Sequence, residues 1–154
     1  LCRCDRHNSL PQPLVCKLDH NGMPVTALYA GLLAGLFLFL SARVIGYRRA
    51  QRVEIGDGED RELLRRIRVH ANFVEYTPFA LILIGLAESM AGTKSMLHVF
   101  GIALLLGRSL HAYALSQSPH ILALRVFGMV LTLGTIFSAA VACALLAILG
   151  GKLI

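Results

Sequence analysis

Hydrophobic residues in this chain form long uninterrupted blocks, and the polar residues gather in short segments between them. Two blocks contain no charged residue, residues 21–42 and residues 126–149. A helix of about 20 apolar residues crosses the hydrocarbon core of a lipid bilayer. Both blocks reach that length, so each predicts a membrane-spanning helix.

Two further apolar segments lie between these blocks and carry a few charged side chains. Short polar or glycine-containing turns separate all four segments, as expected for helices joined by tight connections. The predicted spans are residues 24–47, 63–90, 95–115 and 122–150. Four spans with short turns predict an all-α membrane protein, folded as an up-down bundle of four transmembrane helices.

The composition agrees with a membrane protein. Of 154 residues, 56% are hydrophobic and 16% are charged, which is more apolar and less charged than a typical soluble domain. The net charge of +6 is concentrated, with seven arginines between residues 48 and 68. A basic loop beside a span is the usual signal of a cytoplasmic loop, so no nucleic-acid partner is predicted. We therefore predict that the loop at residues 48–66 is cytoplasmic and that both termini face out.

The first 22 residues differ in composition from the rest of the chain. They hold three of the four cysteines and no apolar periodicity, and Met23-Pro24-Val25-Thr26 makes a natural start to the first span. We predict an extension outside the fold at residues 1–22 and a transmembrane domain at residues 23–154. The spacing of cysteine and histidine in the extension matches no standard zinc motif, so no metal site is predicted.

Polar residues inside the second span fall on one side of the helix. Each helical residue turns by about 100°, so Arg68, Asn72, Glu75 and Tyr76 lie within about a third of the circumference. An ionisable group inside a span costs roughly 2.5–3.5 kcal/mol on insertion scales and usually marks a functional site. The pattern therefore predicts a polar site in the first half of this span.

The third and fourth spans bring more cations to the same membrane level. Arg108 and His111 are three residues apart and share a helix face, and Arg125 opens the fourth span. Together with Arg68, these arginines outnumber the carboxylates at this level. Structural ion pairing, for instance of Arg68 with Glu75, is one interpretation. The surplus of guanidinium groups favours another, a cavity that binds an anionic ligand.

The motif Arg68-x-x-x-Asn72-x-x-Glu75-Tyr76-x-Pro78 resembles that of the MAPEG family, the membrane-associated proteins of eicosanoid and glutathione metabolism. The segment Leu106-Gly107-Arg108-x-x-His111 and the later Arg125 extend the resemblance, which covers about residues 24–150. The opening residues 23–34 are similar to the small bacterial inner-membrane branch of this family.

The resemblance implies a MAPEG-like homotrimer in the bacterial inner membrane, with glutathione bound between neighbouring subunits near the cytoplasmic face. It implies a catalytic role for Arg125, which would stabilise the glutathione thiolate. The residues that would bind glutathione are Arg43, Arg68, Asn72, Glu75, Tyr76, Arg108 and His111. The partners would be the lipid bilayer, glutathione as co-substrate and a hydrophobic small-molecule substrate.

The chemistry of a bound thiol fits these residue types. A free thiol has a pKa of about 8.5, so only a few per cent is thiolate at neutral pH. A nearby guanidinium lowers that pKa and produces a nucleophile, which would attack a lipophilic electrophile. A glutathione transferase or peroxidase is therefore the first hypothesis.

Two positions depart from the family pattern. Leu115 stands one turn past His111, where some catalytic members have a tyrosine, and Val126 follows Arg125, where the prostaglandin-synthase branch has a serine. Eicosanoid reactions are therefore not expected. A non-catalytic membrane module that binds an anionic lipid or metabolite is the alternative hypothesis.

Overall fold

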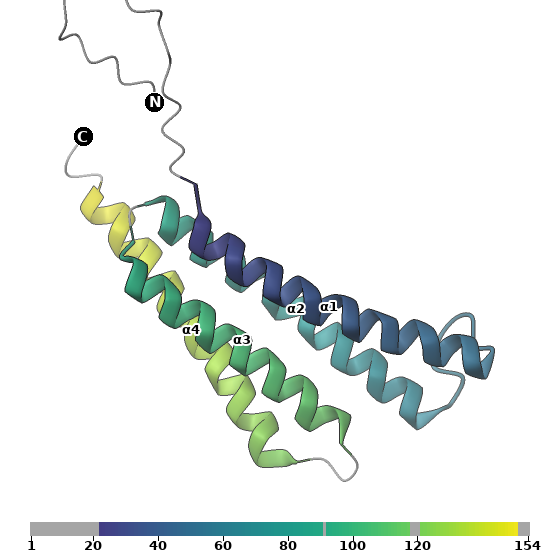
Figure 1. Cartoon of the computed structure of the whole chain (residues 1–154). Helices are drawn as coiled ribbons and strands as arrows, with labels where there is room; N and C mark the ends of the chain where they lie inside the picture. The colour runs from purple at the N-terminus through teal and green to yellow at the C-terminus, as the bar shows by residue number, and fades with distance from the viewer. Residues whose placement is uncertain (1–21, 91, 118–120, 151–154) are drawn as a thin grey trace, which may run out of the picture.

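The structure, a computed structural model, describes residues 22–90, 92–117 and 121–150 as a bundle of four helices (Figure 1). These helices are α1 (Pro24–Gln51), α2 (Arg61–Ser89), α3 (Lys94–Ser116) and α4 (Leu122–Gly150). Each is long and apolar enough to cross a membrane. The predicted four-helix transmembrane bundle is thus confirmed. The predicted extension at residues 1–22 lies outside the described residues, apart from Gly22.

The helices run up and down, and α2 and α3 each contact all three other helices. The start of α1 and the end of α4 lie at one end of the bundle (Figure 1). The connection between α1 and α2 lies at the opposite end, as do the end of α3 and the start of α4. Because α2 contacts each of the other three helices, its polar residues reach a position between the two helix pairs.

Two glycines allow α3 and α4 to approach closely. A Cβ atom on Gly107 would lie 2.8 Å from the Thr132 hydroxyl oxygen, and one on Gly128 would lie 2.7 Å from the Gly107 carbonyl oxygen. Small residues at a helix crossing permit this kind of backbone contact inside membranes. The contact brings the segment of α3 that carries His111 against the first turns of α4.

Asp60 caps the start of α2 and holds the connection to α1. Its carboxylate accepts hydrogen bonds from the backbone N–H groups of Glu62 (2.7 Å) and Leu63 (3.2 Å), and from the Tyr47 hydroxyl (3.0 Å). These hydrogen bonds, first the one from Leu63, favour the ionised form and lower the pKa of Asp60. Because Tyr47 lies near the end of α1, the cap ties the two helices together.

A second carboxylate joins the same two helices at the opposite end of the bundle. Glu88, near the end of α2, accepts hydrogen bonds from the backbone N–H groups of Val25 (2.9 Å) and Thr26 (2.8 Å). The first N–H groups of a helix have no partner within that helix, and the helix dipole favours an anion beside them. Glu88 therefore caps α1 from α2, which accounts for a carboxylate in this apolar part of the chain.

Candidate binding site between the second, third and fourth helices

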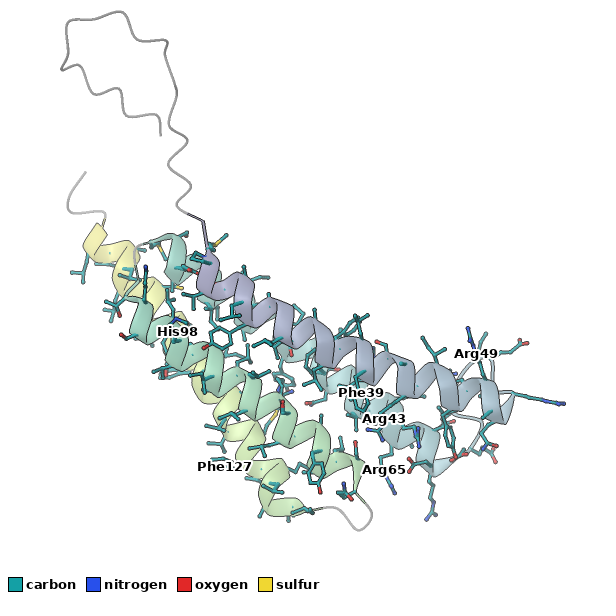
Figure 2. The ribbon with its side chains drawn as sticks, viewed as in Figure 1. Phe39, Arg43, Arg49, Arg65, His98 and Phe127 are labelled. Carbon is teal, nitrogen blue, oxygen red and sulfur yellow. The ribbon has the colours of Figure 1, made fainter. Side chains whose placement is uncertain are left out.

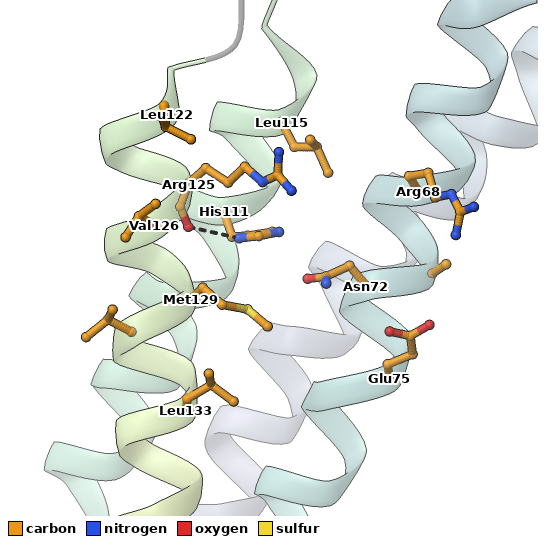
Figure 3. A pocket seen from close by; sticks show the side chains of 12 residues that line it. Arg68, Asn72, Glu75, His111, Leu115, Leu122, Arg125, Val126, Met129 and Leu133 are labelled. Atoms are coloured by element: carbon orange, nitrogen blue, oxygen red, sulfur yellow. Dashed lines mark hydrogen bonds between the residues drawn. The ribbon is translucent and has the colours of Figure 1, made fainter.

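A cavity of about 650 Å³ lies between α2, α3 and α4. Its polar side chains come from all three helices: Arg68, Asn72 and Glu75 from α2, His111 from α3 and Arg125 from α4 (Figure 3). The rest of the lining is apolar and consists of Ala71, Leu115, Leu122, Val126, Met129, Val130 and Leu133. Cavities of about 300–1,000 Å³ are typical for small-molecule ligands, so this one is large enough for a tripeptide.

The polar wall on α2 follows the helix period. Spacings of four and three residues place Arg68, Asn72 and Glu75 on one face of the helix. Arg68 and Glu75 are exposed in the single chain, and Asn72 is half-buried. Figure 3 shows Arg68 extending from α2 away from α4. The edge of the cavity on α2 therefore offers both a guanidinium and a carboxylate to a ligand.

The opposite wall is organised by a hydrogen bond between α3 and α4. The His111 ring is 6% exposed, and its Nδ1 lies 3.1 Å from the backbone carbonyl oxygen of Arg125. A carbonyl oxygen only accepts, so Nδ1 carries a proton, and in the neutral ring Nε2 is the acceptor. Figure 3 shows the His111 ring and the Arg125 guanidinium directed from this wall toward α2. The bond fixes one ring nitrogen and leaves the other for a ligand.

Arg108 lies behind the cavity wall and not in its lining. Its side chain is 1% exposed; Nε donates to Thr132 Oγ1 (2.9 Å) and Nη1 donates to Asn72 Oδ1 (2.8 Å). Nη2 lies 3.6 Å from the Met129 sulfur, and the guanidinium lies 5.5 Å from the centre of the Tyr76 ring. Arg108 therefore holds Asn72 and Met129, which line the cavity. Neither Arg108 nor Tyr76, both predicted to bind the ligand, lines it in the single chain.

The cavity keeps a surplus of positive charge. The only salt bridges among the described residues join Glu62 to Arg65 (2.9 Å) and to Arg66 (3.0 Å), outside the cavity. The alternative that Arg68 pairs with Glu75 is therefore not realised in this structure. Two guanidinium groups and one carboxylate line the cavity, and charges act more strongly there than in bulk water because the surrounding dielectric is lower.

Arg43 lies in a different place from the other predicted ligand-binding residues. It lines a separate cavity of about 330 Å³ between α1 and α3, together with Tyr113. Its Nη1 donates to the Ser116 hydroxyl (2.9 Å), and its guanidinium lies 5.9 Å from the centre of the Phe39 ring. Within one chain, the structure does not bring Arg43 to the candidate site.

Sequence reasoning missed the apolar half of the lining. Leu122, Val126, Met129 and Leu133 follow one face of α4 at helical spacing, and Arg125 lies on that side of the helix. The spacing is present in the sequence. It carried little signal, because α4 has no charged residue beyond Arg125 in its first turn, so the sequence does not show which of its apolar faces borders a cavity.

The described residues offer no metal site. No three His, Cys, Asp or Glu side chains within them gather closely enough to hold a metal ion. The cysteines and histidines of the predicted extension lie outside the residues that the structure describes. The polar groups that remain are donors and charges suited to an organic anion.

The four spans and the charged cavity define an integral membrane protein with a cationic recess between its helices. Comparison with known proteins gives its family. The sequence model of the MAPEG family matches residues 26–145, and the protein belongs to that family. It is also similar to the inner membrane protein YecN of Escherichia coli strains K12 and CFT073, with 44% identity over 89 residues, which is 58% of this chain and 68% of YecN. The protein is an integral inner membrane protein.

Proposed function

We propose that the protein binds glutathione in the cavity between α2, α3 and α4. At neutral pH glutathione carries two carboxylates, one ammonium group and one thiol. The observation that carries the proposal is that Arg68, Glu75, His111 and Arg125, which come from three helices, line one cavity with surplus positive charge. Guanidinium groups fit the carboxylates, and Glu75 fits the ammonium group. Membership of the MAPEG family supports the same ligand.

We further propose that bound glutathione is transferred to lipophilic electrophiles. The Arg125 guanidinium stabilises the thiolate, and the thiol proton leaves to water. The thiolate sulfur then forms a bond to the electrophilic carbon, and the electron pair of the bond that breaks goes to the leaving group. The protein contributes orientation of the two reactants and stabilisation of charge.

The apolar side of the cavity supports a substrate that arrives from the bilayer. Val126, Val130 and Leu133 line the cavity and are 53%, 61% and 48% exposed. These side chains therefore reach both the cavity and the outer surface of the chain, which faces lipid in a membrane protein. A hydrophobic substrate dissolved in the bilayer could approach the thiolate along this surface.

The position of Arg43 supports a site shared between subunits. Arg43 faces away from the candidate cavity of its own chain, between α1 and α3. In the proposed homotrimer, Arg43 of a neighbouring subunit completes the glutathione site. This arrangement accounts for an intramembrane arginine whose hydrogen bond within the chain is to a neutral hydroxyl, that of Ser116.

The alternative is a binding module without turnover, and one observation favours it. Leu115 and Val126 both line the cavity beside Arg125, at the positions where some catalytic relatives have hydroxyl groups. The cavity wall next to the proposed thiolate is therefore apolar here. An anionic lipid or metabolite would still bind to the guanidinium groups of the cavity.

A thiolate difference spectrum tests the proposal. Purified protein mixed with glutathione should gain near-ultraviolet absorbance, and Arg125→Ala should abolish the gain. Arg61→Ala removes an exposed arginine at the start of α2 and serves as the charge-matched control, which should keep the signal. Glutathione binding without a thiolate signal supports the binding module. Absence of glutathione binding by calorimetry contradicts the proposal.

A further inference from the structure

A second basic recess lies at the end of α1, apart from the cavity described above. It has a volume of about 550 Å³ and is lined by Ile45, Arg48, Arg49, Arg52, Val53 and Glu54. None of these residues lines the candidate glutathione site. Figure 2 shows Arg49 at this end of α1, on the opposite side of the helix from Arg43.

The side chains of Arg48, Arg49 and Arg52 do not cap the C-terminal end of α1. The Arg48 carbonyl accepts the backbone N–H groups of Arg52 and Val53, the latter at 3.0 Å, and the Arg49 carbonyl accepts that of Arg52 at 3.3 Å. The backbone thus satisfies these two carbonyls at the end of α1. The three guanidinium groups remain available to another partner.

The chain does not neutralise these guanidinium groups with its own carboxylates. Within the described part of the chain, both salt bridges involve Glu62 and neither involves this recess. Arg48 donates one long hydrogen bond (3.4 Å) to the Glu54 carbonyl oxygen, and the Glu54 side chain is exposed. Arg52 has φ 55°, a left-handed conformation at a helix end that favours glycine.

With Pro24 at one edge of the hydrocarbon core and α1 along the membrane normal, the recess lies at the depth of the lipid headgroups. At the helical rise per residue, Ile45 lies about 31 Å along α1 from Pro24, and Arg48 lies about 36 Å along it. The hydrocarbon core of a bilayer is about 30 Å thick, and the headgroup layers bring the total to about 40–45 Å. Ile45, 49% exposed, therefore reaches the edge of the hydrocarbon core, and the arginines reach the layer of lipid phosphates.

We propose that this recess binds the headgroup of an anionic phospholipid. Its phosphate contacts the guanidinium groups of Arg48, Arg49 and Arg52, and the first part of an acyl chain lies along Ile45. Guanidinium groups bind phosphate through paired, charge-assisted hydrogen bonds. The membrane depth and the apolar edge favour a lipid over a soluble phosphate, which would need neither.

Lipid selectivity of the full chain in vesicles tests this proposal. Spin-labelled phosphatidylglycerol and phosphatidylcholine are compared for the fraction that the protein immobilises. Wild type should prefer phosphatidylglycerol, and Arg49→Gln with Arg52→Gln should lose about five-fold of that preference for each arginine. Arg61→Gln removes the same charge from an exposed position outside the recess and should change the preference less than about two-fold. Glu54→Gln should raise the preference, because it removes a carboxylate that lines the recess and repels the lipid phosphate.

Three outcomes would overturn the proposal. An equal loss in Arg61→Gln and in the double variant would mean that diffuse surface charge, and not the recess, attracts the lipid. An unchanged preference in Glu54→Gln would place the lipid phosphate elsewhere. Displacement of phosphatidylglycerol by inorganic phosphate, but not by chloride at equal ionic strength, would make the ligand a soluble anion.

Discussion

Replacement of Gly128 by alanine should force α3 and α4 apart at the level of the candidate site. The added Cβ atom would lie 2.7 Å from the Gly107 carbonyl oxygen and 2.8 Å from the His111 backbone nitrogen. Ordinary contacts of a Cβ atom begin at 3.4 Å. Both clashing atoms belong to the backbone and cannot rotate away, so the helices must separate by several tenths of an ångström.

The expected losses follow from this separation. Overpacking of a close contact lowers the free energy of unfolding by about 1–3 kcal/mol. The separation also stretches the 3.1 Å hydrogen bond from His111 to the Arg125 carbonyl, which orients the cavity wall. A hydrogen bond contributes about 0.5–1.5 kcal/mol, so its loss should weaken glutathione binding by up to about ten-fold.

Gly134→Ala is the matched control for this prediction. Gly134 lies on the same helix, and an added Cβ atom there meets nothing within 4 Å. Alanine also favours a helix over glycine, so this variant should be at least as stable as wild type. Unfolding in detergent, followed by circular dichroism, measures stability, and calorimetry measures glutathione binding. If Gly128→Ala matches Gly134→Ala in both measurements, the close contact does not organise the site.

Three further predictions address the ligand, the loop and the topology. Arg68→Gln and Glu75→Gln should each weaken glutathione binding, measured by calorimetry, about ten-fold or more. Size-exclusion chromatography should show an unchanged oligomer for both variants. Loss of the oligomer in either variant would identify a structural role for that residue instead. The pKa of Asp60 is lower in the folded state than in the unfolded state, where it is near 3.9. The ionised carboxylate therefore contributes its full stabilisation at pH values above the unfolded-state pKa. This stabilisation is lost as the pH falls through the folded-state pKa. The stability difference between wild type and Asp60→Asn should therefore shrink in acid, and a difference independent of pH in thermal melts would contradict the cap. In a chain without other cysteines, Ile55→Cys places a thiol at a position that is 90% exposed in the loop between α1 and α2. This thiol should react with an impermeant maleimide only after the membrane is permeabilised. Reaction in intact cells would contradict the predicted topology.

The spans were predictable because the length and the mean hydropathy of a segment decide whether it can cross the bilayer as a helix. The end of α1 was not predictable in this way. The predicted span stops at Tyr47, but the helix continues to Gln51, beyond the apolar block. Hydropathy marks where a chain leaves the membrane, whereas the helix ends where the backbone N–H groups of Arg52 and Val53 donate to the carbonyl oxygens of its last turn.

The spacing on α2 placed four residues at the candidate site, and one of them, Tyr76, does not line the cavity in the single chain. Arg68, Asn72 and Glu75 share a face of α2 by their spacing, and all three line the cavity. Spacing also puts Arg108 and His111 on one face of α3, yet His111 lines the cavity and Arg108 enters the core behind it. The difference depends on how α3 is rotated and packed against α4. That packing is a property of two helices together, which the pattern of either one does not contain.

The buried position of Arg108 changes its expected role. An arginine within a span costs roughly 2.5–3.5 kcal/mol on insertion scales. Arg108 donates hydrogen bonds to Thr132 Oγ1 and to the side-chain and backbone oxygens of Asn72. Because the donor is charged, each of these hydrogen bonds contributes about 1.5–3 kcal/mol to stability. These bonds are sufficient to hold the guanidinium without a carboxylate or a ligand. Arg108 therefore affects the cavity by orienting Asn72. The amide oxygen of Asn72 accepts the hydrogen bond from Arg108, so the NH₂ group of Asn72 remains as a donor for a ligand.

With Arg108 set aside, the charge of the cavity lining can be compared with the proposed ligand. Arg68, Arg125 and Glu75 give the lining of one chain a net charge of about +1 at neutral pH. Glutathione with an intact thiol has two carboxylates and one ammonium group, so its net charge is −1; the thiolate form has −2. In the proposed homotrimer, Arg43 of a neighbouring subunit raises the positive charge by one. A single chain therefore matches the thiol form, and the completed site matches the thiolate, so subunit assembly itself would favour the nucleophile.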